Sequence, residues 1–571
     1  MIIQPLIIPS KERQSEIFFR GGKVTDGGLA LAKGESLSTD TYFNSFSYTI
    51  YRHYTSVSEV NAFVNFSGEV RLELCLFDGS EKVLAEKTAA GESSGELSVS
   101  IELSALPDGA FLYFRITALV ESVIYGGGYS SDAKPRNIEC CVAICTFKRE
   151  EYAMRNVETL CRYSFSFIKK ILIVDNGKTL PANKFPGDKA ELLQNKNYGG
   201  SGGFTRGMLE AKRRGFSHIL LMDDDISFYP EVFERMTIFL SLLRTEYKNS
   251  WISAAMLSQR VPSMQFAIGC YWNNGAVENR GHALDIRDRK NLLASVQSTD
   301  TVNYGAWWCL AMPTGVFDKA GYPFPFFIKF DDVEYGVRQK NKCDIITMNG
   351  IAVTHEDFDS KFSMHLIYYE CRNLLVTCAS DIDASAADIL SRLFNTAGKQ
   401  LILYRYDALK LVIRAFDDFF KGVDFFLNCD EEKLNSEIMS AVPKPQIIKN
   451  DTEYLPVEYD SKRISVWQIL TLGGHLIPSC FMDKTESDIS AVTDDYRQCF
   501  RHMVIRQHAG QDKCYVMSRN FGRFIKSVGS VMRIAFKIIF MYNRTKREYV
   551  SRKSEITSES FWEKHLGLDI G

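Results

Sequence analysis

Three adjacent carboxylates, Asp223, Asp224 and Asp225, follow a short apolar run in the sequence HILLMDDD. Such groups repel one another and are rarely left together without a positive partner. Because alternate side chains of an extended backbone share a face, Asp223 and Asp225 can point at one cation while Asp224 points elsewhere. Mg²⁺ and Mn²⁺ prefer oxygen ligands, often carboxylates acting together with substrate phosphates. The triplet therefore predicts a divalent-metal site, with a solvated acidic turn as the alternative.

A candidate third ligand, His355, ends a second apolar stretch in the sequence GIAVTHEDF. Most single histidines in proteins are structural. A histidine that ends a strand of the same domain is nevertheless a credible partner for the acidic triplet. We therefore expect Asp223, Asp225 and His355 to share one ion.

A second pair of carboxylates, Asp331 and Asp332, follows a loop rich in Pro and Phe and begins a predicted helix, DDVEYGVR. Carboxylates at this position can cap the helix. Beside a sugar pocket, one of them can instead take the proton of an acceptor hydroxyl. The neighbouring pair Trp307–Trp308 either belongs to the core or presents aromatic faces to sugar rings.

The sequence NKNYGGSGGFTRGM contains glycines at positions 199, 200, 202 and 203. Glycine lets a backbone approach a ligand closely, and Thr205–Arg206 are expected to open a helix whose N-terminus would favour phosphate. The stretch matches neither the Walker A motif nor the GxGxxG dinucleotide motif. A flexible loop is the alternative.

These residues need a scaffold, and the surrounding segments predict one. CCVAIC (140–145), KKILIVDNG (169–177) and HILLMDDD (218–225) read as strands that alternate with helical segments. This order is typical of a parallel, doubly wound α/β sheet, in which ligands bind beyond the carboxyl ends of the strands. All three strands end in polar residues: Thr146 to Arg149, Asp175–Asn176, and the acidic triplet.

The flanking regions have different patterns. From about Phe18 to Tyr125, short segments alternate apolar and polar residues between Gly, Asp and Ser, which predicts an antiparallel sandwich or jelly roll. We expect a structural or oligomer-contact role for it rather than carbohydrate binding, which leaves a homo-oligomer open. Gly126 to Asn137 reads as a linker. Beyond Phe394 amphipathic helices are expected, giving domains 1–130, 131–395 and 396–571.

Composition limits the classes of function. The chain has 571 residues, 45% of them hydrophobic, and its 68 Lys and Arg nearly balance 70 Asp and Glu, so we expect no nucleic-acid partner. The N-terminus lacks the pattern of a signal peptide, and no apolar run approaches the roughly 18 to 20 residues that span a bilayer. The 14 scattered cysteines predict reduced thiols of a cytosolic protein.

A segment near the C-terminus mixes basic and apolar residues. From Arg519 to Lys553 it holds ten Lys or Arg and one acidic residue, Glu548. It is too interrupted by charge to span a bilayer, but it can lie on an anionic membrane surface. The apolar residues expected to face the acyl chains are Phe524, Ile525, Val528, Met532, Phe536 and Ile539. The alternative is a helix packed on the protein's own core.

The order of these motifs, from VAICTFKRE through ILIVDNG, NYGGSGGFTRG, LLMDDD and the WW…DDVEY segment to VTHEDF, closely resembles that of the polymerising galactofuranosyltransferases of glycosyltransferase family 2. Members of that family build cell-wall galactan. The resemblance covers the whole chain and implies a GT-A (Rossmann-like) glycosyltransferase domain, preceded by an N-terminal β-sandwich and followed by a C-terminal helical domain.

The resemblance also implies a division of labour. The donor would be UDP-galactofuranose, the cofactor Mn²⁺ or Mg²⁺, the acceptor a lipid-linked glycan, and the reaction would invert the anomeric centre. Asp223, Asp225 and His355 would bind the metal, and Asp332 would be the general base. The remaining positions would contact the nucleotide sugar (Thr146, Arg149, Asp175, Asn176, Asn197, Arg206, Asp223 and Asp224) or the acceptor (Trp307, Trp308 and Asp331).

Two alternatives stay open at this point. A transferase of the same architecture can use another donor, such as a rhamnosyl or pyranose sugar. A sugar-binding scaffold with a degenerate transferase domain would not be an enzyme, although the joint presence of Asp223, Asp225, Asp332 and His355 argues against it. The expected location is the cytoplasmic face of the cell membrane, where a lipid-linked acceptor meets a soluble donor.

Overall fold

The structure is a computed structural model that describes residues 1–9, 15–89, 93–181, 185, 188–273, 276–298, 302–357, 362–447, 466–489, 500–509 and 513–568. The chain forms two compact units. Unit 1 comprises Met1–Asn197, Gly203–Gly321 and Tyr335–Glu356, and unit 2 comprises Tyr198–Gly202, Tyr322–Glu334 and Asp357–Gly571. Each unit is described by itself.

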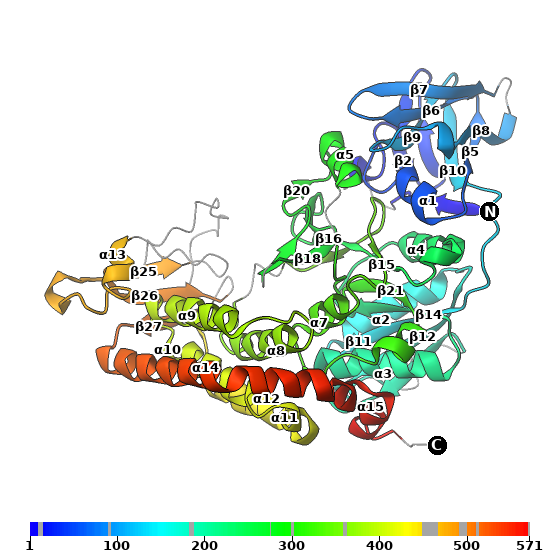
Figure 1. The fold of residues 1–571 in the computed structure, drawn as a ribbon. Coiled ribbons are helices and arrows are strands. Elements are labelled where there is room, and N and C mark those ends of the chain that lie inside the picture. The colour runs from blue at the N-terminus through cyan, green and yellow to red at the C-terminus, as the bar shows by residue number, and fades with distance from the viewer. Residues whose placement is uncertain are drawn as a thin grey trace. The chain divides into compact units, whose positions relative to one another are not determined.

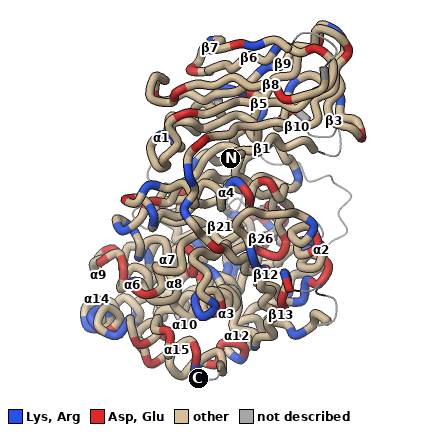
Figure 2. Tube along the Cα trace, turned by 90° about the vertical axis from the view of Figure 1, so that its right-hand side faces the viewer, with Lys and Arg blue, Asp and Glu red and all other residues tan. Residues whose placement is uncertain are grey.

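Unit 1 begins with a sandwich of two antiparallel sheets, as the alternating pattern predicts (Figure 1). One sheet has the order β2-β3-β10-β5-β8, with β1 beside β10, and the other has the order β4-β9-β6-β7. Their bounds are β1 (Ile2–Pro5), β2 (Lys23–Thr25), β3 (Gly28–Leu31), β4 (Ser36–Ser38), β5 (Glu59–Gly68), β6 (Val70–Phe77), β7 (Glu81–Thr88), β8 (Ser93–Glu102), β9 (Phe111–Ala118) and β10 (Ser122–Ser130), with helix α1 (Tyr48–Tyr54) between β4 and β5. Figure 2 shows acidic and basic residues interspersed along these strands.

The first half of the predicted linker is strand rather than linker, because Gly126, Gly127 and Gly128 lie within β10. A Cβ at Gly127 would lie 2.5 Å from the Phe63 carbonyl oxygen, and one at Gly128 would lie 2.2 Å from the Gln4 carbonyl oxygen. These glycines therefore allow β10 to pack closely between β5 and β1, so their turn-like composition was misleading.

A central sheet of order β13-β12-β11-β14-β21-β15-β22 forms the α/β part of unit 1. Strands β13 to β14 are parallel, as predicted, whereas β21 runs antiparallel to both of its neighbours, so the sheet is mixed. The bounds are β11 (Cys140–Thr146), α2 (Glu150–Arg162), β12 (Ile168–Asp175), β13 (Ala190–Gln194), α3 (Gly199–Arg213), β14 (His218–Asp223), α4 (Pro230–Leu242), β15 (Trp251–Ser253), β21 (Cys309–Pro313), α6 (Val316–Ala320), α7 (Asp331–Arg338) and β22 (Ile345–Ile346). The first turns of α3 and α7 belong to unit 2.

A smaller sheet of order β20-β17-β16-β23 carries His355 at the end of its last strand. Its elements and their neighbours are β16 (Ala255–Ser258), β17 (Met264–Ala267), the hairpin β18 (Cys270–Asn273) and β19 (Ala276–Asn279), β20 (Leu284–Asp285), α5 (Arg289–Gln297) and β23 (Ala352–His355). Arg235 of α4 links this region to the sandwich, since its guanidinium donates to the Phe43 carbonyl (2.6 Å) and the Gly350 carbonyl (3.0 Å).

Unit 2 is mainly helical, which agrees with the predicted C-terminal helical region. Its helices are α8 (Leu366–Ser380), α9 (Ala386–Ile402), α10 (Tyr406–Phe419), α11 (Val423–Asn428), α12 (Glu431–Ser440), α13 (Val466–Leu470), α14 (Phe521–Thr557) and α15 (Glu559–His565). It also holds a sheet that the sequence did not suggest, β24 (Gln446–Ile447), β27 (Lys513–Ser518), β26 (His502–His508) and β25 (Asp483–Ile489), in that spatial order. Strand β25 (DKTESDI) is mostly exposed and polar, so it lacks the apolar alternation that marks a strand. None of the helices in the described ranges is long and apolar enough to cross a bilayer.

Candidate active site

The polar ends of the three predicted strands lie at one edge of the central sheet. Thr146 at the end of β11 pairs in register with Asp175 at the end of β12, and Cys145 pairs with Asp223 at the end of β14. Parallel strands bring their carboxyl ends to the same edge, where α/β sheets bind ligands. The register thus confirms the convergence of polar residues that the sequence indicates.

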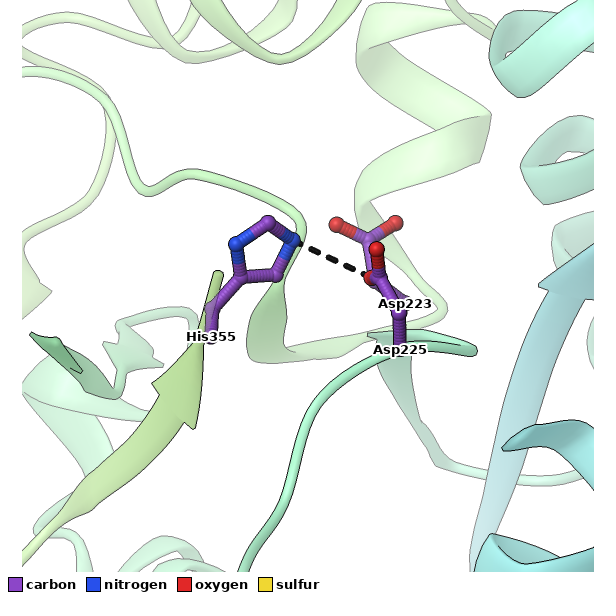
Figure 3. A group of neighbouring side chains, drawn as sticks. All are labelled: Asp223, Asp225 and His355. Atoms are coloured by element: carbon purple, nitrogen blue, oxygen red, sulfur yellow. Dashed lines mark ion pairs between the residues drawn. The ribbon is translucent and has the colours of Figure 1, made fainter. Parts of the chain in front are cut away.

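Backbone hydrogen bonds position His355 beside the acidic triplet. Ser227, two residues beyond Asp225, exchanges two 2.8 Å hydrogen bonds with Thr354, the residue before His355. This bridge ties the acidic turn to β23, and the His355 Nε2 atom lies 3.1 Å from an Asp225 carboxylate oxygen. Figure 3 shows the imidazole facing Asp225 with Asp223 beside it. One ligand atom from each of the three residues lies within 4.8 Å of the others, as expected for residues that share one ion.

The donor set fits a divalent cation. The His355 Nδ1 atom lies 2.6 Å from the Glu356 carbonyl oxygen, and a proton on Nδ1 leaves the Nε2 lone pair directed at the carboxylates. Burial would raise the pKa of Asp225, but His355 and Arg149 together lower it to about 2. Burial alone would lower the pKa of His355, yet the carboxylates of Asp225 and Asp223 raise it. Two carboxylates and one imidazole suit Mn²⁺ or Mg²⁺ completed by phosphate oxygens.

The middle carboxylate of the triplet is buried and anchored. The Thr146 hydroxyl donates to Asp224 over 2.7 Å, and the Arg149 guanidinium lies 3.3 Å from the other Asp224 oxygen. Burial raises the pKa of Asp224. Arg149 also pairs with Asp225, while 46% of its side chain stays exposed. A half-exposed guanidinium beside the metal candidates is suited to bind a diphosphate. The nucleotide role of these three residues stays a prediction.

Asn156 holds the acidic turn from below, and sequence reasoning missed it. Its side-chain amide is buried in α2 and donates to the Asp224 carbonyl (2.8 Å) and the Ile226 carbonyl (3.1 Å). The only signal was an amide on the apolar face of an amphipathic helix, which is uncommon because a buried amide requires partners.

Asp175 and Asn176 shape the loop that follows β12. The Asp175 carboxylate is fully buried and accepts 2.8 Å hydrogen bonds from the backbone N–H groups of Gly177, Thr179 and Leu180. Asn176 accepts a 3.0 Å bond from the Asn195 side chain. Asp175 thereby fixes the loop geometry, and its predicted nucleotide contact would have to come in addition to these bonds.

The glycine-rich stretch is already helical, which corrects the expected helix start at Thr205–Arg206 and argues against the alternative of a flexible loop. Helix α3 begins at Gly199, six residues before Thr205, so Thr205 and Arg206 lie inside the helix. A Cβ at Gly203 would lie 2.2 Å from the Cys145 sulfur, and one at Gly207 would lie 2.7 Å from the Ala143 side chain. The glycines at 203 and 207 therefore serve close packing of α3 on β11. Arg206 pairs with Glu210 over 3.1 Å. Its predicted nucleotide contact, like that of the part-buried Asn197, stays a prediction.

The tryptophan pair lies in the interior of unit 1. Trp307 and Trp308 are 4% and 7% exposed, and the Trp308 indole N–H donates to the Ala254 carbonyl over 2.8 Å. The Trp308 carbonyl accepts a 3.2 Å bond from the Asp223 N–H, so this residue braces the end of β14. Trp307 meets Phe204 edge to face at 5.3 Å. Contact of either ring with an acceptor sugar stays a prediction.

In unit 2, Asp331 and Asp332 are partly buried at the start of α7. The Ser201 hydroxyl donates to Asp331 over 3.1 Å, and an Asp332 oxygen accepts from the Val333 N–H over 2.8 Å. Burial raises the pKa of Asp331. Burial and the adjacent Asp331 charge raise the pKa of Asp332 to about 7. A carboxyl group with a pKa near neutrality is suited to exchange protons with a hydroxyl.

The loop before these aspartates is strained. Phe327, Lys329 and Phe330 all have positive φ, between 66° and 72°, a region that costs a side-chain-bearing residue about 1 kcal/mol or more. Buried residues of α8 hold it: the Asn373 amide donates to the Ile328 and Lys329 carbonyls (3.0 and 2.7 Å), and Arg372 donates to the Phe326 carbonyl (2.8 Å). Sequence reasoning missed both α8 residues. Strain that is held in this way is typical of functional sites.

Comparison with known proteins agrees with this arrangement. Residues 20–132 match the family model of the galactofuranosyltransferase 2 N-terminal region, and residues 141–241 match that of glycosyl transferase family 2. The chain is 26% identical over 461 residues to the galactofuranosyltransferase GlfT2 of Mycolicibacterium smegmatis, covering 74% of this chain and 70% of that protein. It is 24% identical over 473 residues to the GlfT2 of Mycobacterium tuberculosis, covering 77% and 74%.

Solved structures with a similar chain path include a mannosyltransferase of Pyrobaculum calidifontis in complex with GDP-Man and Mn²⁺, with a TM-score of 0.29, 11% identity, and coverage of 44% of this chain and 68% of that one. Glucosyl-3-phosphoglycerate synthase of Mycobacterium tuberculosis gives a TM-score of 0.29, 11% identity, and coverage of 42% and 80%.

The sheet, its polar edge and the two family matches define the chain as a glycosyltransferase with a family 2, GT-A catalytic domain. Within that class, its resemblance is to the galactofuranosyltransferases, in the N-terminal region as well as in the catalytic domain. The resemblance that the motifs indicate is thus confirmed.

Proposed function

We propose that the protein transfers galactofuranose from UDP-galactofuranose to a growing cell-surface glycan, with inversion at the anomeric carbon. The main observation behind this proposal is that Asp223, Asp225 and His355 lie close enough to share one metal ion at the polar edge of the sheet. It is supported by the similarity to galactofuranosyltransferases over three quarters of the chain.

The residues of unit 1 would bind the donor. Asp223, Asp225 and His355 would hold Mn²⁺ or Mg²⁺, which supplies Lewis-acid stabilisation of the departing diphosphate. Arg149 already lies against the same carboxylates with nearly half of its side chain exposed, so it can donate to the developing negative charge. Thr146 and Asn156 keep the acidic turn in place.

Asp332 would be the general base that removes the proton of the acceptor hydroxyl. Its pKa of about 7 leaves it ionised in a large share of molecules at neutral pH, while it still binds a proton readily. A single displacement with one base and no covalent intermediate inverts the anomeric centre.

The test is a donor and acceptor panel. Purified protein is incubated with Mn²⁺ and with UDP-galactofuranose, UDP-galactopyranose, UDP-glucose or dTDP-rhamnose, together with synthetic lipid-linked galactofuranosyl acceptors, and products are identified by mass spectrometry. We expect elongation from UDP-galactofuranose. Elongation from another donor alone would overturn the donor assignment, and no elongation by a folded protein from any donor would overturn the enzymatic proposal.

We further propose that unit 2 associates peripherally with the membrane that carries the acceptor. Helix α14 buries one face in the protein, which corrects the expected orientation of Phe524, because this ring is 3% exposed and stacks on His475 at 4.1 Å. Another stripe of the same helix is apolar and exposed by 45% to 78% (Ile525, Met532, Phe536, Ile539 and Phe540). Such a stripe is suited to the interface of a bilayer.

The charge of α14 is partly compensated. Arg533 and Lys537 pair with Asp417, and Lys553 pairs with Asp381. Lys526, Arg544 and Arg547 have no carboxylate partner in the part of the chain that the structure describes, so they remain available to anionic headgroups.

Vesicle co-sedimentation tests the membrane proposal. We expect the protein to sediment with anionic vesicles more than with neutral ones and less at high salt, because screening weakens the attraction of the basic residues. The double substitution Phe536→Ser and Phe540→Ser should reduce binding, whereas Phe394→Ser, at an exposed phenylalanine of α9, should not. Equal binding to both kinds of vesicle, or none, would reject the proposal.

A further inference from the structure

A cavity of about 630 Å³ lies within unit 1 between the sandwich and the segment that follows β20, away from the polar strand ends. Figure 1 shows α5 beside the sandwich strands. Hydrogen bonds dock the segment there: Arg20 donates to the Arg287 carbonyl over 2.6 Å, and Gln297 of α5 donates to the Gly109 carbonyl over 2.8 Å. The cavity is therefore a fixed feature of one compact unit, of a size that holds a small ligand.

A chain of alternating guanidinium and carboxylate groups crosses the wall of this cavity. Its members run in the order Arg20, Asp40, Arg289, Glu81, Arg115 and Glu73, with separations of 3.2, 3.0, 3.4, 2.6 and 2.9 Å. Asp40 is 3% exposed, whereas the side chains of Arg20, Arg289 and Glu81 are 37% to 38% exposed. The ion pairs therefore fix the orientation of the three part-exposed side chains.

This arrangement suits hydroxyl groups. A guanidinium offers five N–H donors, and Arg289 uses its Nη1 atom for both Asp40 and Glu81, with no other hydrogen-bond partner among the described residues. Its guanidinium carbon lies 4.9 Å from the Phe77 ring centroid, which fixes the plane of the group. The N–H groups that Arg289 leaves unused, together with the Glu81 carboxylate as acceptor, can bind vicinal hydroxyls of a sugar. Because these side chains are already ordered, binding does not incur the entropy cost of ordering them. A free anion would have to compete with the carboxylates that already pair with Arg20, Arg289 and Arg115.

The small sheet connects this cavity to the metal candidates. Its order β20-β17-β16-β23 has the cavity segment at one edge and His355 at the other. Asp285 pairs with Met264 and His355 pairs with Ser258, and these two partners flank the turn between β16 and β17. Asp285 and His355 therefore lie at the same end of the sheet, on its two edge strands. Three strand spacings separate these edge strands, which is about 14 Å at the usual spacing. That distance exceeds one sugar ring.

We propose that the cavity is a remote acceptor subsite that binds a saccharide unit of the growing glycan, several residues from the reacting end. The proposal rests on the proposed function, since it supposes that the acceptor is a glycan. It assigns a function to the docking of the β20–α5 segment on the sandwich and predicts that longer acceptors bind more tightly than short ones.

The test compares acceptor lengths. Initial rates are measured with UDP-galactofuranose and a galactofuranosyl disaccharide or hexasaccharide on the same lipid-like aglycone, for the wild type, Arg289→Gln and Glu81→Gln. The control is Arg162→Gln, at an 80% exposed arginine of α2 that pairs with Glu158 of the same helix. Binding of the hexasaccharide without donor is followed in parallel by saturation-transfer NMR, and thermal melting checks that each variant is folded.

We expect both cavity variants to raise the KM for the hexasaccharide by about five- to tenfold, the loss of one or two hydrogen bonds, with kcat and the KM for the disaccharide unchanged. Their hexasaccharide NMR signal should weaken, and that of the control should not. Equal effects on both acceptors, or none on either, would overturn the subsite. Hexasaccharide binding that depends on Arg289, without any transfer, would overturn the proposed donor but keep the subsite.

Discussion

The pH dependence of transfer should report the pair Asp331–Asp332. If Asp332 is the general base, only its ionised form is active, so kcat/KM should be low in acid and rise through the pKa of the group. Burial and the Asp331 charge raise that pKa from 3.8 to about 7. The rising limb of the wild-type profile should therefore lie near pH 7 rather than near pH 4.

The substitution Asp331→Asn removes one of these two causes and nearly preserves size. Burial, the larger cause, remains, so the pKa of Asp332 should fall only in part. One neighbouring charge at a partly buried position contributes an energy on the order of 1.4 kcal/mol, which corresponds to one pH unit. The rising limb should thus move to lower pH by about one unit.

The assay measures kcat/KM for a lipid-linked acceptor from about pH 5 to 9 at saturating donor and Mn²⁺. Loss of an acceptor contact in Asp331→Asn would lower the whole profile, so the position of the limb, not its height, is the readout. Ser201→Ala, which removes a neutral hydrogen bond to Asp331 without removing charge, is the control. A limb that stays in place in Asp331→Asn would refute the assignment of Asp332, as would a wild-type limb near pH 4.

Other substitutions probe the same chemistry. Asp332→Asn should lower kcat by roughly 10²-fold while the KM for the donor changes little, and turnover within a few-fold of the wild type would leave Asp332 as a helix cap. Chelator should abolish transfer, Mn²⁺ or Mg²⁺ should restore it, and Asp225→Ala should weaken UDP binding in calorimetry; activity in excess chelator would contradict this. Asn373→Ala should lower kcat by about tenfold with unchanged UDP affinity, because it frees the strained loop before Asp331. Asn156→Leu should lower stability to urea by about 1–3 kcal/mol, since it removes the bond to the Asp224 carbonyl and leaves the Ile226 carbonyl only its bond from Arg155; an unchanged midpoint would show that the Asp224 carbonyl finds another partner.

Much of the scaffold could be predicted because it depends on local patterns. Apolar strands that alternate with helices gave the parallel part of the central sheet, and the polar residues at their ends gave its functional edge. The antiparallel strand β21 and the exposed strand β25 were not expected, because strand direction and the pairing of polar strands depend on distant partners. The glycines of α3 were misread because the sequence does not show how closely β11 approaches.

The two groups of carboxylates show why part of a site is visible in a sequence and part is not. Asp223 and Asp225 follow a buried strand directly, so the strand pattern alone fixes their place at the sheet edge. Asp332 depends on a loop with three residues in the left-handed region, and side chains more than 40 positions later, Asn373 and Arg372, help to hold that loop. The first geometry is stabilised by the sheet itself, whereas the second is a strained backbone conformation that depends on buried side chains of another helix. Substitutions at these buried positions of α8, far from the motifs that identify the family, should therefore lower transfer while the donor still binds.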